Sequence, residues 1–137
     1  MRAVIDTNVL LVAISRKTKY YTIFNSFING EYVLCVTTDI LNEYAEKLAQ
    51  KFSESVMFNT MKAIDKSPDV LQVHKYFFWN LITADPDDNK FVDCAVAASA
   101  DYLVTEDKHF KVLKNIPFPP VTVVSMDDFL EVLQNIK

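Results

Sequence analysis

The chain has very little glycine, cysteine and histidine for its length. It holds one glycine, two cysteines and two histidines among 137 residues. A single glycine, with no repeat and no low-complexity tract, excludes collagen, propeller and solenoid architectures and leaves no flexible linker between domains. No apolar run approaches the roughly 18 residues that a membrane-spanning helix needs, and no signal peptide opens the chain. We therefore expect a cytoplasmic protein that does not interact with a membrane.

The overall composition is that of a globular protein. Half of the residues are apolar and 23% are charged. This balance is typical of one compact domain, which we expect to span residues 1–137. Cys35 and Cys94 lack the spacing of a metal knuckle or a disulfide framework, so they are predicted to be reduced core residues.

Short apolar runs alternate with segments of helical spacing. The predicted strands are 2–5, 33–36, 70–73, 103–105 and 121–124. Helices are expected to begin near Thr37, Ser53 and Ser125, and one is expected to end at Gly30. The aromatic residues 76–79 have no clean period and are assigned no element. Strands that are continuous apolar runs indicate a parallel sheet covered on both faces. The expected fold is therefore a three-layer α/β/α sandwich with a central, mainly parallel, five-stranded sheet.

Acidic residues stand where this fold would bring them together. Asp6 directly follows the first predicted strand, and Asp107 lies two residues after the fourth. Because the carboxyl ends of parallel strands share one edge of a sheet, both side chains are expected at that edge. Glu43 and Asp93 lie in early turns of helices that begin after strands. The four carboxylates are therefore predicted to converge on one spot.

A cluster of four carboxylates is unfavourable unless something offsets the repulsion between their charges. Two carboxylates about 5 Å apart repel by roughly 3 kcal/mol at an effective dielectric constant near 20. Either some of the carboxylates are protonated or a cation lies among them. Ligation by oxygen alone favours Mg²⁺ or Mn²⁺ over zinc. The implied chemistry is hydrolysis of a phosphate ester, in which one ion activates a water and a second stabilises the leaving oxygen.

Four blocks of sequence contain these acidic residues. In chain order they are Asp6-Thr-Asn-Val-Leu, the lone Glu43, Asp93-Cys-Ala-Val-Ala-Ala and Leu103-Val-Thr-Glu-Asp107-Lys-His-Phe110. Together they resemble the signature blocks of PIN-domain ribonucleases, and the resemblance covers essentially the whole chain. The stretch Asp85-Pro-Asp-Asp-Asn89 is similar to the toxin-component branch of that family, which includes the VapC-like toxins of toxin–antitoxin pairs.

The resemblance implies a metal-dependent endoribonuclease that cuts single-stranded or looped RNA. Such proteins are commonly homodimers and are sometimes held inactive by an antitoxin. Carried over by position, the metal ligands would be Asp6, Glu43, Asp93 and Asp107. The groups that orient these ligands and the attacking water would be Thr7, Asn8 and Thr105. Asp88 resembles an additional acidic position that would either extend the metal site or only cap its helix.

The basic residues indicate an RNA-binding surface less clearly than the acidic residues indicate a metal site. The net charge is −4, so the chain lacks the overall basic character typical of nucleic-acid binding. Arg16, Lys17 and Lys19 are nevertheless candidates for RNA contacts, because they follow the first strand's loop, on the edge where a phosphate backbone would approach. Solvated side chains without a partner are the alternative. His109 would serve as a general base or phosphate contact, or would only begin a helix.

Other interpretations stay open at this point. Each acidic residue could be only a helix cap. Glu46 lies almost one turn from Glu43 and could exchange roles with it. Receiver domains and aspartyl-phosphate phosphotransferases also hold Mg²⁺ at strand ends, but they need an Asp-x-Asp after the first strand and a strand-end lysine, which this sequence lacks. A non-catalytic module that binds RNA or protein on the same fold is the second alternative.

Overall fold

The computed structural model describes residues 1–74, 78–82 and 86–136, and it contains one five-stranded sheet. The strands are β1 (Arg2–Ile5), β2 (Val33–Val36), β3 (Val70–Gln72), β4 (Tyr102–Val104) and β5 (Val123–Val124). The α-helices are α1 (Thr7–Ala13), α2 (Tyr21–Ile28), α3 (Thr38–Lys51), α4 (Glu54–Lys66), α5 (Asn89–Ala97) and α6 (Met126–Asn135). Two 3-10 helices are η1 (Pro86–Asp88) and η2 (Lys108–Asn115).

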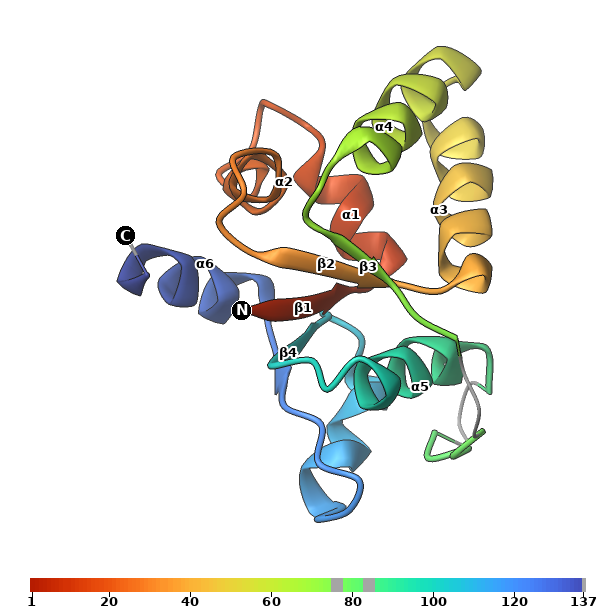
Figure 1. The fold of residues 1–137 in the computed structure, drawn as a ribbon, viewed down its shortest axis with the longest axis vertical. Coiled ribbons are helices and arrows are strands. Elements are labelled where there is room, and N and C mark those ends of the chain that lie inside the picture. The colour runs from red at the N-terminus through yellow and green to blue at the C-terminus, as the bar shows by residue number, and fades with distance from the viewer. Residues whose placement is uncertain (75–77, 83–85, 137) are drawn as a thin grey trace.

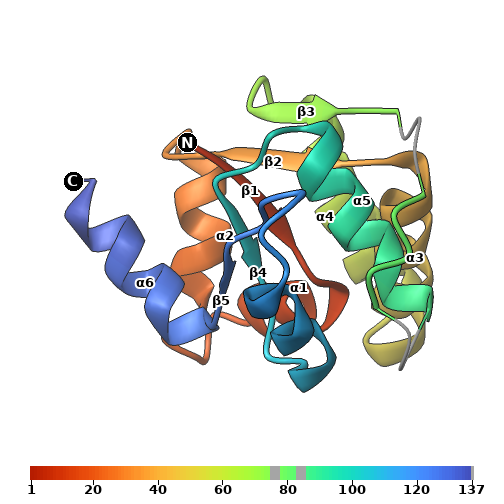
Figure 2. The ribbon, with the colours of Figure 1, turned by 90° about the horizontal axis from the view of Figure 1, so that it is seen from below.

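The sheet is parallel throughout and is covered on both faces. The strand order is β3-β2-β1-β4-β5, and each neighbouring pair is parallel. Helices α1 to α4 cover one face, with α6 beside α2 (Figure 1). Helix α5 and η2 cover the other face, which Figure 2 shows from their side. The predicted three-layer α/β/α fold is therefore confirmed.

The chain changes direction across the sheet at its centre. From β1 it proceeds outward to β2 and β3, and it then returns past β1 to β4 and β5. The segments that follow β1 and β4 leave toward opposite faces, since α1 lies on one face and η2 on the other. Parallel sheets bind ligands at the carboxyl ends of two such strands, where the diverging connections leave a crevice.

Apolar burial explains why these short strands form. The core positions of β1, β2 and β4 are almost completely inaccessible to solvent: Ala3, Val4, Ile5, Leu34, Cys35, Val36, Leu103 and Val104. Such runs fit a sheet that packs on both faces. Cys35 and Cys94 are both free and buried, which confirms their prediction as core thiols.

Local capping signals mark the helix ends as predicted. The side chains of Thr37, Ser53 and Ser125 accept hydrogen bonds from the backbone N–H groups of the first turns of α3, α4 and α6. Gly30 follows α2 with a φ of +75°, a left-handed conformation that favours glycine.

The sequence predicted none of three short helices, and it misplaced some strand ends. No helix was predicted to begin at Thr7, the first residue of α1, and neither η1 nor η2 was predicted. Strands β3 and β4 end one residue before their predicted ends, and β5 is shorter than predicted. Of the aromatic segment, Phe78 and Trp79 lie in no helix or strand, as expected, and residues 76 and 77 lie outside the described residues. No helix in the described part of the chain is long and apolar enough to cross a bilayer.

One buried hydrogen bond ties the end of β1 to α3. Tyr44 is completely buried, and its hydroxyl donates to the carbonyl of Ile5. We expect Tyr44→Phe to lower the free energy of unfolding by about 1 to 3 kcal/mol, because it leaves a buried carbonyl without its donor. Urea unfolding followed by circular dichroism measures this change. Tyr20→Phe, which removes a hydrogen bond to Asp127 near the surface, should change stability by under about 0.5 kcal/mol. Equal losses in the two variants would contradict the expectation.

Candidate functional site

The carboxyl ends of β1 and β4, whose following segments leave toward opposite faces, form the switch point of the sheet. Asp6 lies there and is buried. It directly follows β1, its backbone N–H donates to the Val104 carbonyl of β4 at 3.0 Å, and the residue is 5% exposed. Its side chain makes no capping hydrogen bond to α1. Instead, Oδ2 accepts a hydrogen bond of 2.7 Å from the hydroxyl of Thr105. The Asp6 carboxylate is therefore tied to the segment that follows β4.

The same threonine connects Asp6 to Asp107. Thr105 directly follows β4, and its Oγ1 accepts a hydrogen bond of 3.0 Å from the backbone N–H of Asp107. The Asp107 carboxylate in turn accepts a hydrogen bond of 2.9 Å from the backbone N–H of His109, so it caps η2. Asp107 thus combines the structural role of a cap with a position beside Asp6.

The environment of Asp6 disfavours its charged form. Burial raises the pKa of this carboxyl, and the charges of Asp107 and Glu43 raise it further. The hydrogen bond from Thr105 acts in the opposite direction, but the pKa remains above its ordinary value. A cation beside Asp6 would relieve this cost.

Glu43 is held by groups from two other helices. The hydroxyl of Thr7, at the start of α1, donates to its Oε2, and the ammonium of Lys90 on α5 lies 2.8 Å from its Oε1. Burial lowers the pKa of Lys90, but its contacts with Glu43 and Asp87 outweigh that effect and raise the pKa overall. Lys90 is therefore a fixed cation beside Glu43. These contacts distinguish Glu43 from Glu46, for which the structure gives no comparable contact in the described residues.

Asp93 is buried on α5 beside the aromatic segment. It is 3% exposed, and its Oδ1 accepts a hydrogen bond of 3.1 Å from the backbone N–H of Trp79. One turn earlier, the side chain of Asn89 binds both backbone groups of Ile82, at 2.9 and 2.8 Å. Residues 78–82 are thereby tied to the helix that carries Asp93.

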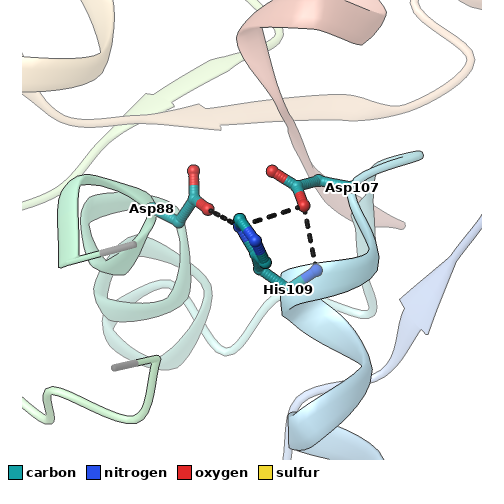
Figure 3. A group of neighbouring side chains, drawn as sticks. All are labelled: Asp88, Asp107 and His109. Carbon is teal, nitrogen blue, oxygen red and sulfur yellow. Dashed lines mark hydrogen bonds and ion pairs between the residues drawn. The ribbon is translucent and has the colours of Figure 1, made fainter. Parts of the chain in front are cut away.

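Asp88 and His109 form a third part of the site. In Figure 3 the His109 imidazole lies between two carboxylates, with Nδ1 at 3.3 Å from Oδ1 of Asp107 and 3.5 Å from Oδ2 of Asp88. Among the described residues, only these three supply potential metal-ligand atoms that all lie within 4.8 Å of one another. Asp88 makes no capping hydrogen bond to α5.

The predicted carboxylates line two cavities rather than one. A cavity of about 290 Å³ is lined by Asp6 and Asp107, together with Asn8. A second cavity, of about 540 Å³, is lined by Glu43 and Asp93. The two are linked at α1, because Thr7 follows Asp6 in the chain and donates to Glu43. The structure thus brings Asp6 to Asp107, and Glu43 to Asp93, at one edge of the sheet.

Comparison with known proteins identifies the family. The family model described as the PIN domain matches residues 2–109, from β1 to the start of η2. The chain belongs to the PIN domain family. The match spans every predicted metal ligand, namely Asp6, Glu43, Asp88, Asp93 and Asp107. No curated protein sequence matches this chain.

A solved structure shares the fold of this PIN domain. It is the crystal structure of VapBC2 from Rickettsia felis bound to a DNA fragment from their promoter, and the TM-score is 0.64. The two sequences are 14% identical over 91% of this chain and 98% of that chain. At this identity the likeness shows a common fold.

The three basic residues predicted to contact RNA are exposed on this PIN domain. Lys19 forms a surface ion pair of 3.1 Å with Asp127, in the first turn of α6 after β5, so it lies at the same sheet edge as the carboxylates. The Arg16 guanidinium lies 5.7 Å from the centre of the Tyr21 ring. Lys17 is exposed.

Sequence reasoning missed Lys90 as a member of the site and left the role of His109 open. The spacing of Asp87 and Lys90 is a recognisable i,i+3 pair, and these side chains do meet at 2.9 Å. The contact between Lys90 and Glu43 depends on how α5 packs against α3, for which the sequence of this PIN domain carries no local signal.

Neutralising Asp6 should stabilise the PIN domain without metal. Because the pKa of Asp6 is raised in the folded state, ionisation of this group destabilises the fold above that pKa. We expect Asp6→Asn in EDTA to raise the free energy of unfolding at pH 7 by roughly 1 kcal/mol. This advantage should vanish as the pH falls through 3.8, the ordinary value for aspartate. Urea unfolding at several pH values measures it, and a variant less stable than the parent at pH 7 would refute the electrostatic argument.

Proposed function

We propose that this PIN domain is a divalent-metal-dependent endoribonuclease that hydrolyses RNA phosphodiester bonds. The observation that carries the proposal is the buried Asp6, which shares a cavity with Asp107 at the switch point of the sheet. Its pKa is raised by burial and by neighbouring carboxylates. An energetically costly group at a ligand-binding position is typical of a functional site.

The donor set fits Mg²⁺ or Mn²⁺. Both ions prefer carboxylate oxygens, and Mg²⁺ is usually held by a few carboxylates together with substrate phosphates. Asp6 and Asp107 would hold an ion in the cavity that they share, Glu43 and Asp93 would add negative charge from the adjoining cavity, and Asp88 would lie at the edge of the site. When bound, the ion would activate a water for attack on phosphorus and stabilise the leaving oxygen.

The neighbouring polar residues would orient these ligands. Thr105 fixes one oxygen of Asp6 by donating to it, and Thr7 does the same for Glu43. Asn8 lines the cavity that Asp6 and Asp107 share. Preorganised carboxylates need no rearrangement when the ion binds, which favours catalysis.

Basic residues at the sheet edge would contact the RNA backbone. Lys19 lies at this edge, and Arg16 and Lys17 are exposed in the same loop. Their contacts would position the phosphate backbone without reading base sequence.

A toxin–antitoxin role is the further part of the proposal. The fold is shared with VapBC2, and the chain would be the toxin of such a pair, held inactive by an antitoxin and assembled as a homodimer. These partners would cover apolar surface, which the chain offers at Phe58, Phe78 and Phe118, each more than half exposed.

Family membership weighs against aspartyl-phosphate chemistry. Aspartyl-phosphate chemistry needs a lysine at a strand end. The lysine that contacts the carboxylates of this site is Lys90, but it is on α5, and its ammonium is bound to Glu43 and Asp87. A non-catalytic module on the same fold is distinguished from the proposed nuclease by activity alone.

Asp6→Asn and Asp93→Asn should each abolish RNA cleavage that depends on Mn²⁺, a loss of at least about a hundredfold, because each removes a buried negative charge from the site. The assay incubates purified protein with a mixed RNA pool, with and without EDTA, and maps the cleaved ends. Asp65→Asn, at an exposed position on α4, is the matched control and should cleave at the parental rate. Undiminished cleavage in both site variants, or cleavage that resists EDTA, would rule out the proposed mechanism. An inactive parent would favour the non-catalytic module.

A further inference from the structure

Lys90 places a fixed positive charge inside the carboxylate site. Its side chain is 11% exposed, and Nζ lies 2.8 Å from Oε1 of Glu43 and 2.9 Å from Oδ1 of Asp87. Nζ also donates to the backbone carbonyl of Asp87 at 3.0 Å. An ammonium has three N–H donors, and here each has its own acceptor. The position of this cation is therefore set by the protein.

This ion pair differs from an ordinary surface pair. Lys90 and Glu43 are 11% and 17% exposed, whereas Lys19 and Asp127 are 67% and 64% exposed. Charges that are shielded from solvent are costly unless they are paired and hydrogen-bonded. Glu43 meets this condition completely, since Thr7 donates to its second oxygen. The arrangement is that of a built-in counter-ion.

We propose that the ammonium of Lys90 takes the place of a second divalent ion, so that the site binds one Mg²⁺ or Mn²⁺ per chain, on the side of Asp6 and Asp107. The proposal rests on the metal dependence proposed above and adds the number of ions and the residue that determines it.

Electrostatic repulsion supports a single ion. An ion bound to Oε1 of Glu43 at about 2.1 Å would lie within about 5 Å of Nζ, since Nζ is 2.8 Å from that oxygen. At an effective dielectric constant near 20, repulsion between a divalent ion and an ammonium at that distance corresponds to roughly five powers of ten in affinity. A second ion beside Glu43 would therefore be strongly disfavoured while Lys90 stays charged.

The cavity of Asp6 and Asp107 has no lysine among its described residues that would repel a divalent ion. No lysine or arginine is found among the residues that line it, within the part of the chain that the structure describes. The lining includes Asp6, Asp107 and Glu106 and the side chain of Asn8. A divalent ion is thus favoured here, while the cavity of Glu43 and Asp93 already contains its cation.

The number of bound Mn²⁺ ions tests the proposal directly. Equilibrium dialysis of the full chain, with free Mn²⁺ measured by electron paramagnetic resonance, should give one ion per chain for the parent. Lys90→Met should bind two, because the charge that excludes the second ion is gone. Lys90→Arg, which keeps the charge, should bind one. The control is Lys47→Met, which removes an exposed lysine that lines the same cavity, and it should also bind one.

The outcomes separate this inference from the proposed function. Two ions bound to the parent, or one ion bound to Lys90→Met, would overturn the role of Lys90, and RNA cleavage by the parent would still support the nuclease. No Mn²⁺ bound to the parent would contradict both proposals. If Lys90→Met does not fold, as judged by circular dichroism, Lys90→Gln replaces it, because Gln removes the charge but keeps a hydrogen-bond donor.

Discussion

Mutual repulsion of carboxylates at one edge of the sheet is the constraint on which the site depends. Asp6 is buried beside Asp107, and the charges of Asp107 and Glu43 both raise its pKa. The protein compensates with local groups: Thr105 donates to Asp6, and Thr7 and Lys90 bind the two oxygens of Glu43. Like charges remain together only where such partners offset the cost of burial. The surrounding polar residues are therefore part of the site.

The topology of the sheet explains why these groups meet. Strands β1 and β4 are neighbours, and their following segments leave toward opposite faces, which opens the edge between them. Asp6 follows one strand, and Thr105 and Asp107 follow the other. Helix α5 covers the adjoining part of the sheet and brings Asp88, Lys90 and Asp93 to the same edge. A rigid parallel sheet thus positions side chains that come from three separate segments.

The site is electrostatically asymmetric. Lys90 neutralises part of the charge in the cavity that contains Glu43 and Asp93, whereas no lysine or arginine is among the described residues that line the cavity of Asp6 and Asp107. Electrostatics therefore favours a divalent ion in the cavity of Asp6 and Asp107 over one in the cavity of Glu43 and Asp93. In the proposed arrangement, the cavity of Asp6 and Asp107 would hold the metal ion, and the cavity of Glu43 and Asp93 has a cation that belongs to the protein. His109, between Asp88 and Asp107, contacts the carboxylate that lines the cavity proposed for the ion.

Local patterns determined most of the fold: the apolar runs predicted all five strands, and threonine, serine and glycine marked helix ends, because burial and capping act between residues close in sequence. The carboxylates Asp6 and Asp107 were predictable because they follow strands whose ends must meet in a parallel sheet. Helix α1 and η2 escaped prediction, since Thr7, Asn8 and the residues after Asp107 are also typical of turns. The tertiary structure alone decided that Lys90 binds Glu43, that His109 lies between two aspartates and that the carboxylates line two cavities. These contacts depend on the packing of α5 against α3 and β4, and packing between distant segments leaves no periodic signal in the sequence.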